Sequence, residues 1–161
     1  FIQGYLYEKK CQQLIFSFED ACLDWEKQGD DIAVIEPLVT LLAAWEMTLF
    51  LRSMIHGRAL YSLDTQKIAG DIYKDRSFSA DEFLYIRCAA LINSKRYYND
   101  IVSGRRKLKG SLSFESILSV PAFAWARVHG KPENEYPHTT KYCYETMSNI
   151  EGWKGKTERE D

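Results

Sequence analysis

The sequence predicts an all-α fold, a compact bundle of six or seven helices around a buried central helix. Three observations lead to this prediction. Apolar residues recur at three- and four-residue steps along most of the chain, which is the spacing of one face of an α-helix. Residues that start or end helices, above all Ser, Asp, Gly and Pro, separate these stretches. The chain is 45% hydrophobic and 14% aromatic, enough for a buried core and too apolar for disorder.

The first two predicted helices supply much of this apolar content. Residues 5–28 predict an amphipathic helix that Gly29 ends. Residues 38–55 are apolar almost all round, so we expect them to form the central helix, with Pro37 in its first turn. The longest apolar run, residues 38–51, contains Glu46 and is shorter than the ~20 residues that cross a bilayer. We therefore expect no membrane span within this chain.

The middle of the chain predicts three shorter helices. Residues 58–76 are helical, with a new start where Asp64 and Thr65 can cap. Ser79 is followed three residues later by Glu82, which is the pattern of a capping box. The helix that begins there carries an apolar face.

A break at Asn93 and Ser94 precedes the third of these helices. Residues 95–102 resume the helical pattern, with one ring of the Tyr97–Tyr98 pair inward and the other toward the surface. Gly104 ends the helix.

The last third predicts two further helices and a tail. Residues 111–129 are helical, with a kink or a split at Pro121 and an end at Gly130. Residues 139–150 predict a final helix, and residues 151–161 a flexible tail. Residues 1–150 would then form one domain, and Tyr142, Cys143, Met147 and Ile150 would face inward in the last helix.

Positive charge is densest around and after residues 95–102, although the formal net charge of the chain is −2. Solvated surface charge is one interpretation of this cluster. The other is a site for an anionic partner: an acidic peptide, a phospholipid head group or a nucleic acid. The acidic balance of the whole chain argues against nucleic acid as the main ligand. The predicted partner-binding residues are Arg87, Lys95, Arg96, Arg105, Arg106, Lys107 and Lys109.

The sequence contains no recognisable catalytic, cofactor or metal motif. Its four cysteines form no C-x-x-C pair and suit the core of a protein from a reducing compartment. His129, His138 and Cys143 do not have the spacing of a zinc site. The glycines of residues 152–155 lack the spacing of a phosphate-binding loop. We therefore expect neither an enzyme nor a bound cofactor.

Arg52 and His56 support an alternative. An Arg followed by a His on one helix is similar to the ribonucleases of the HEPN class, which place four to six residues between the two. Here three residues intervene. A HEPN-like ribonuclease toxin thus remains a second hypothesis, beside a generic helical scaffold for protein interactions. The plain interpretation is that both side chains lie near a helix C-terminus, where positive charge is favourable.

Several short segments within residues 56–150 form a recognisable set. They are Glu82-Phe83-Leu84-Tyr85-Ile86-Arg87, Tyr97-Tyr98, Gly104-Arg105-Arg106, Phe114-Glu115, Phe123-Ala124-Trp125 and Gly130-Lys131-Pro132. This set resembles the DotM/IcmP–TrbA family of type IV secretion and conjugation coupling-complex proteins, which has a Ser-Ala-Glu-Phe-Leu-Trp-Leu-Lys segment, an aromatic pair, Gly-Arg-Arg, Phe-Glu, Phe-Ala-x-Trp and Gly-Arg-Pro. A family Pro-x-Asp-Arg is replaced here by Cys88-Ala89-Ala90, and extra residues precede the Tyr pair.

The resemblance implies a helical domain on the cytoplasmic face of the bacterial inner membrane. Residue 1 is Phe, which agrees with a fragment of a longer protein whose membrane contact lies elsewhere. The implied function is non-enzymatic: docking the coupling ATPase and binding acidic segments of transported proteins through the basic cluster. The implied partners are other proteins of the secretion or conjugation complex.

Overall fold

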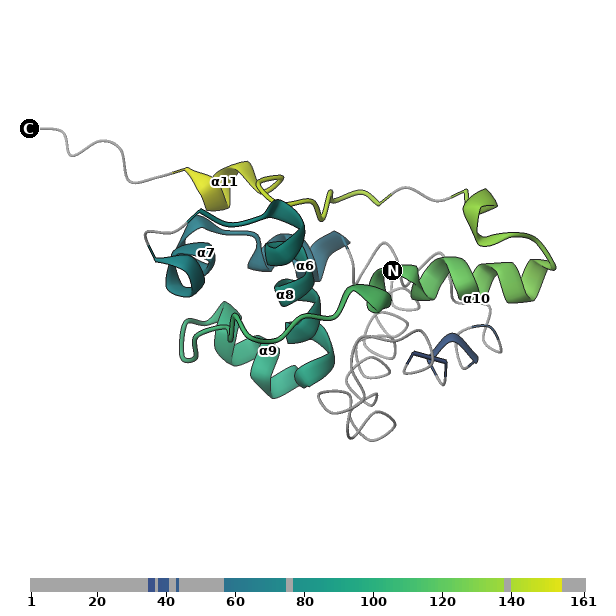
Figure 1. Cartoon of the computed structure of the whole chain (residues 1–161), viewed down its shortest axis with the longest axis horizontal. Coiled ribbons are helices and arrows are strands. Elements are labelled where there is room, and N and C mark those ends of the chain that lie inside the picture. Colours follow the sequence, from purple (N-terminus) through teal and green to yellow (C-terminus); the bar gives the residue numbers. More distant parts are fainter. Residues whose placement is uncertain are drawn as a thin grey trace, which may run out of the picture.

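In the computed structural model of the protein, residues 35–36, 38–40, 43, 57–74, 77–137 and 140–154 are described. These residues form helices joined by loops and contain no strand, which confirms the predicted all-α fold (Figure 1). No helix among them is long and apolar enough to cross a membrane. The helices are α6 Leu60–Leu63, α7 Gln66–Tyr73, α8 Ala80–Asn93, α9 Lys95–Val102, the 3₁₀ helix η2 Glu115–Ser119, α10 Val120–His129, the 3₁₀ helix η3 Glu133–Glu135 and α11 Ile150–Trp153.

Within the described ranges, α8 is the buried central helix. It contacts α6, α9 and η2, and every one of its residues from Ile86 to Ile92 is buried. One of its faces packs against η2 and α10 through Leu84, Leu91 and Phe114. The other packs against α6, α7 and α9. Most of residues 38–55, predicted for the central position, lie outside the described residues, although Leu38 is buried in the first of these clusters.

The predicted helix starts of the middle region are confirmed, because three hydroxyl side chains cap them. Thr65 accepts a hydrogen bond from the backbone N–H of Ile68 at the start of α7. Ser79 accepts one from the N–H of Glu82 at the start of α8, which is the serine half of the predicted capping box. Ser94 separates α8 from α9 and caps α9. Local sequence therefore sets these boundaries.

The sequence predicted either a kink or a split at Pro121, and the structure shows no kinked long helix there. Pro121 occupies the first turn of α10, where its missing N–H is not needed, and η2 precedes it. The predicted split is therefore the correct alternative. Gly130 ends α10 in a left-handed conformation with φ +62°, as predicted.

The predicted helix over residues 139–150 is wrong for its described part. Residues 140–149 run as a non-helical strap over the outside of the bundle, and helix begins only at α11 (Figure 1). Met147 and Ile150 are 58% and 67% exposed and Cys143 is exposed, although all three were expected inward. Residues 140–154 are called the C-terminal strap below.

A buried carboxylate explains why residues 140–149 of the strap are not helical. The backbone N–H groups of Met147 and Asn149 donate to the carboxylate of Asp64, at 3.1 and 3.0 Å. Trp153 donates its indole N–H to the same carboxylate at 2.8 Å. A distant side chain thus takes donors that a helix would have used. The predicted tail also starts too early, because Trp153 packs its ring against Phe78.

Candidate functional site

The basic segment after α9 follows a fixed path along that helix. The backbone N–H of Arg106 donates to the carbonyl of Asp100, and the N–H of Lys109 donates to the hydroxyl of Tyr97 at 3.3 Å. Leu108, which lies between Arg106 and Lys109 in the sequence, has a buried side chain. Residues 103–109, called the basic loop below, therefore present exposed side chains from an anchored backbone.

Two cations of the basic loop are locally balanced by acidic side chains. Arg105 forms an ion pair with Asp100 at 2.9 Å, and Lys107 forms one with Asp71 of α7 at 2.8 Å. Both cationic side chains are well exposed, so each pair stabilises the fold by no more than about 1 kcal/mol. Their main effect is to reduce the charge that these two residues offer to a partner.

Four other cations, on α7, on α9 and in the basic loop, carry the available charge, and they are called the open cations below. All four are exposed, and none forms an ion pair with another of the residues that the structure describes. The guanidinium of Arg106 lies 5.2 Å from the ring centroid of Tyr97, which holds it by a cation–π contact. The open cations are Lys67, Arg96, Arg106 and Lys109.

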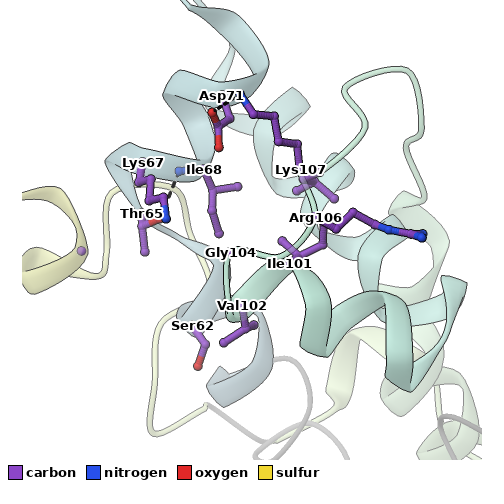
Figure 2. A pocket seen from close by; sticks show the side chains of 12 residues that line it. Ser62, Thr65, Lys67, Ile68, Asp71, Ile101, Val102, Gly104, Arg106 and Lys107 are labelled. Atoms are coloured by element: carbon purple, nitrogen blue, oxygen red, sulfur yellow. Dashed lines mark hydrogen bonds and ion pairs between the residues drawn. The ribbon is translucent and has the colours of Figure 1, made fainter.

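A hollow of about 420 Å³ lies beside the basic loop, between α7 and the end of α9 (Figure 2). Its charged lining consists of Lys67, Arg106 and Lys107 with one carboxylate, that of Asp71. Its apolar lining includes Val102, which is 47% exposed. The hollow therefore offers positive charge and apolar surface side by side.

Lys67 was not predicted as a site residue. It lies on α7, and only the packing of α7 against the end of α9 brings it to Gly104. A Cβ added at Gly104 would lie 3.1 Å from the Lys67 Nζ. A lone Lys on a short helix gave no signal of this position in the sequence.

Arg87 does not belong to the exposed cluster, and its prediction as a partner-binding residue is wrong. Its side chain is 0% exposed; Nη1 donates to the carbonyl of Leu60 and Nη2 to the hydroxyl of Thr146, both at 3.0 Å. Asp64 lies 4.0 Å away. Burial lowers the pKa of Arg87, while the charge of Asp64 opposes that effect. Because α8 is enclosed on both faces, a cation on it is enclosed too.

The sequence did contain a signal for this buried charge. Arg87 stands inside an otherwise apolar run from Phe83 to Ile92, where a helix buried on both faces leaves no solvated side. Such a residue needs an acidic partner. The acidic partner is Asp64, from the turn before α7, and only the fold could identify it.

The remaining candidate residues either lie outside the described residues or have a structural role. Lys95 starts α9, but its side chain lies outside the described residues, as do Arg52, His56 and His138. His129 stacks on Trp125, with ring centroids 4.8 Å apart, and its Nδ1 lies 2.9 Å from the Trp125 carbonyl, which is a structural role. The described part of the chain contains no group of three or more His, Cys, Asp or Glu that could hold a metal ion.

The site therefore consists of the basic loop, the open cations and the hollow. It offers exposed positive charge from an anchored backbone. Comparisons of the chain with protein-family models, with curated proteins and with solved structures give no match.

Proposed function

We propose that this protein binds acidic segments of other proteins through the open cations, as a non-enzymatic component of a bacterial type IV secretion or conjugation coupling complex. In this proposal it also docks the coupling ATPase at the cytoplasmic face of the inner membrane. Two things support it: the sequence resemblance over residues 56–150 and the charge arrangement around the basic loop. The second is the observation that carries the binding function.

Carboxylates suit this surface for two physical reasons. Arginine can hold a carboxylate through two parallel hydrogen bonds, and Arg96 and Arg106 are both exposed. The backbone of the basic loop is already anchored by Asp100 and Tyr97, so binding need not order it. A surface that is organised before binding loses less conformational entropy on binding.

The local charge also favours a protein segment over nucleic acid. Lys107 and Arg105 are balanced by Asp71 and Asp100, which leaves separated open cations instead of a continuous basic stripe. Nucleic-acid sites usually combine such a stripe with a basic domain, and the formal charge of this chain is −2.

The experiment compares two double variants in binding to a labelled Glu-rich peptide at low salt. Arg106→Gln with Lys109→Gln removes two open cations, and Lys131→Gln with Lys141→Gln removes two exposed lysines elsewhere. The first variant should weaken binding about fivefold, because exposed charge pairs contribute about 0.2–1 kcal/mol each. The second should bind like the wild type.

Equal affinity of wild type and the Arg106/Lys109 variant at low salt would refute the binding proposal. A Gly-Ser peptide of the same length controls for charge-independent binding. The coupling-complex role has its own test: the protein, tagged and expressed in its source cell, should capture the coupling ATPase from detergent-solubilised membranes. Recovery of no secretion protein in that capture would refute the role.

A further inference from the structure

We propose that the hollow beside the basic loop holds an apolar side chain of the bound segment, next to the acidic residue that the open cations contact. This inference rests on the proposed function and deepens it, because it names the class of segment. The surface would recognise a carboxylate and an aliphatic side chain close together in one extended peptide. Charge alone would not specify the ligand.

Two helices form the apolar walls of the hollow. Ile68 comes from α7, whereas Ile101 and Val102 come from the last turn of α9 (Figure 2). Val102 is 47% exposed and is one of four large apolar side chains exposed among the described residues. A hollow of about 420 Å³ falls within the usual range of roughly 300–1,000 Å³ for small binding sites. An aliphatic side chain that entered it would remove part of Val102 from water.

The charges on the lining point to an acidic neighbour for that side chain. Three cations line the hollow against one carboxylate, Asp71, which already has Lys107 as its partner. The guanidinium of Arg106 points away from the hollow (Figure 2) and lies against the ring of Tyr97, so Lys67 is the cation that remains for a ligand there. This excess of positive charge complements a carboxylate at the opening and not a neutral or basic segment.

Gly104 contributes to this arrangement through its conformation. Its φ is +74°, which ordinary side chains rarely adopt, and a Cβ there would approach the Lys67 ammonium to 3.1 Å. Glycine thus lets Lys67 lie against the turn that ends α9. Lys67 and Val102 consequently line the same hollow. A peptide with a carboxylate next to an aliphatic side chain could contact both.

The test uses two acidic peptides that differ at one position, Leu in one and Ser in the other, with Val102→Ser and Val128→Ser as the protein variants. Val128 on α10 is the matched control, because it is 38% exposed and does not line the hollow. The wild type should bind the Leu peptide about fivefold more tightly, as expected for partial burial of one aliphatic side chain. Val102→Ser should abolish this preference, and Val128→Ser should keep it.

The outcomes separate this inference from the function on which it rests. Salt-dependent binding of both peptides with equal affinity would overturn the apolar site and leave the charge-based function standing. Loss of the Leu preference in both variants would also overturn it. Binding to neither peptide would overturn both proposals. Vesicles with an anionic lipid serve as a further probe, and binding to them in place of either peptide would overturn the peptide inference.

Discussion

Replacing Asp64 by Asn should destabilise the protein more than any exposed charge change. The Asp64 carboxylate is fully buried, and its two oxygens accept four hydrogen bonds from the C-terminal strap. It also faces the guanidinium of Arg87 at 4.0 Å. An amide has nearly the same shape but only one accepting oxygen, so the variant changes the chemistry and not the volume.

The magnitude follows from these contacts. Asn can keep the donors on one oxygen, either Met147 and Trp153 or Asn149 and Ser148, and loses the other two. Each lost bond to a charged acceptor costs about 1.5 kcal/mol or more. The two lost bonds amount to about 3 kcal/mol. Leaving the buried cation of Arg87 without its acid costs about 3–5 kcal/mol, a range that already contains these bonds, so the two figures are not summed. We expect a loss of about 3–5 kcal/mol, against total stabilities of about 5–15 kcal/mol for single domains.

Urea unfolding followed by circular dichroism measures this loss. Asp71→Asn is the matched control, because Asp71 pairs with an exposed lysine and should cost about 1 kcal/mol at most. Arg87→Met in the Asp64→Asn background should recover part of the loss, because no buried charge then remains. Hydrogen exchange at Met147 and Asn149 should accelerate in Asp64→Asn if the strap opens before the bundle.

A loss below about 1 kcal/mol, equal to that of the Asp71→Asn control, would refute this reasoning. It would mean that water or a shift of the strap replaces the carboxylate at little cost. The reasoning would also be refuted if the double variant lost as much stability as the two single variants together. Additive losses would mean that Asp64 and Arg87 act independently.

Four further predictions concern two glycines, a cap and a tyrosine. Gly70→Ala should raise the free energy of unfolding, measured in urea, by about 0.5–1 kcal/mol, because the added Cβ would meet nothing within 4 Å in helix α7. Gly152→Ala should lower it by more than about 1 kcal/mol, because its Cβ would lie 2.7 Å from a facing backbone oxygen. In the same assay, Ser94→Ala should cost about 1 kcal/mol through loss of the α9 cap. The hydrogen bond to Glu115 is the main cause that raises the pKa of Tyr85 to about 12 from 10.0, so Glu115→Gln should lower it. Ring-carbon NMR of labelled tyrosine measures that pKa. A raised pKa favours the protonated folded state, so this stabilisation is present below pH 10 and is lost between pH 10 and about 12.

Local signals in the sequence were sufficient for the middle of the fold. Thr65, Ser79 and Ser94 each satisfy a backbone donor within three residues, so their effect does not depend on the rest of the chain. The left-handed end of α10 at Gly130 is equally local. The apolar content of α8 likewise predicted that it is buried, although burial covers every residue from Ile86 to Ile92 and not one helical face alone.

Long-range contacts explain what local signals could not give. Residues 140–150 have a helical apolar pattern, but the Asp64 carboxylate accepts hydrogen bonds from the N–H groups of Met147 and Asn149, and residues 140–149 are not helical. The candidate site was half predictable: the basic loop is visible in sequence, whereas Lys67 reaches it only through the packing of α7 on α9. Arg87 was misplaced for the same reason, since neighbours in sequence need not share a surface.

By itself, then, the sequence determined the helical class, the helix starts and the presence of a positive cluster, because each depends on residues a few positions apart. Only the tertiary structure decided which charges are available. It buried Arg87 beside Asp64, balanced Arg105 and Lys107 with acids from α9 and α7, and left Lys67 beside the hollow. The physical reason is that charge at a surface depends on burial and partners, and both are set by contacts between segments distant in the chain.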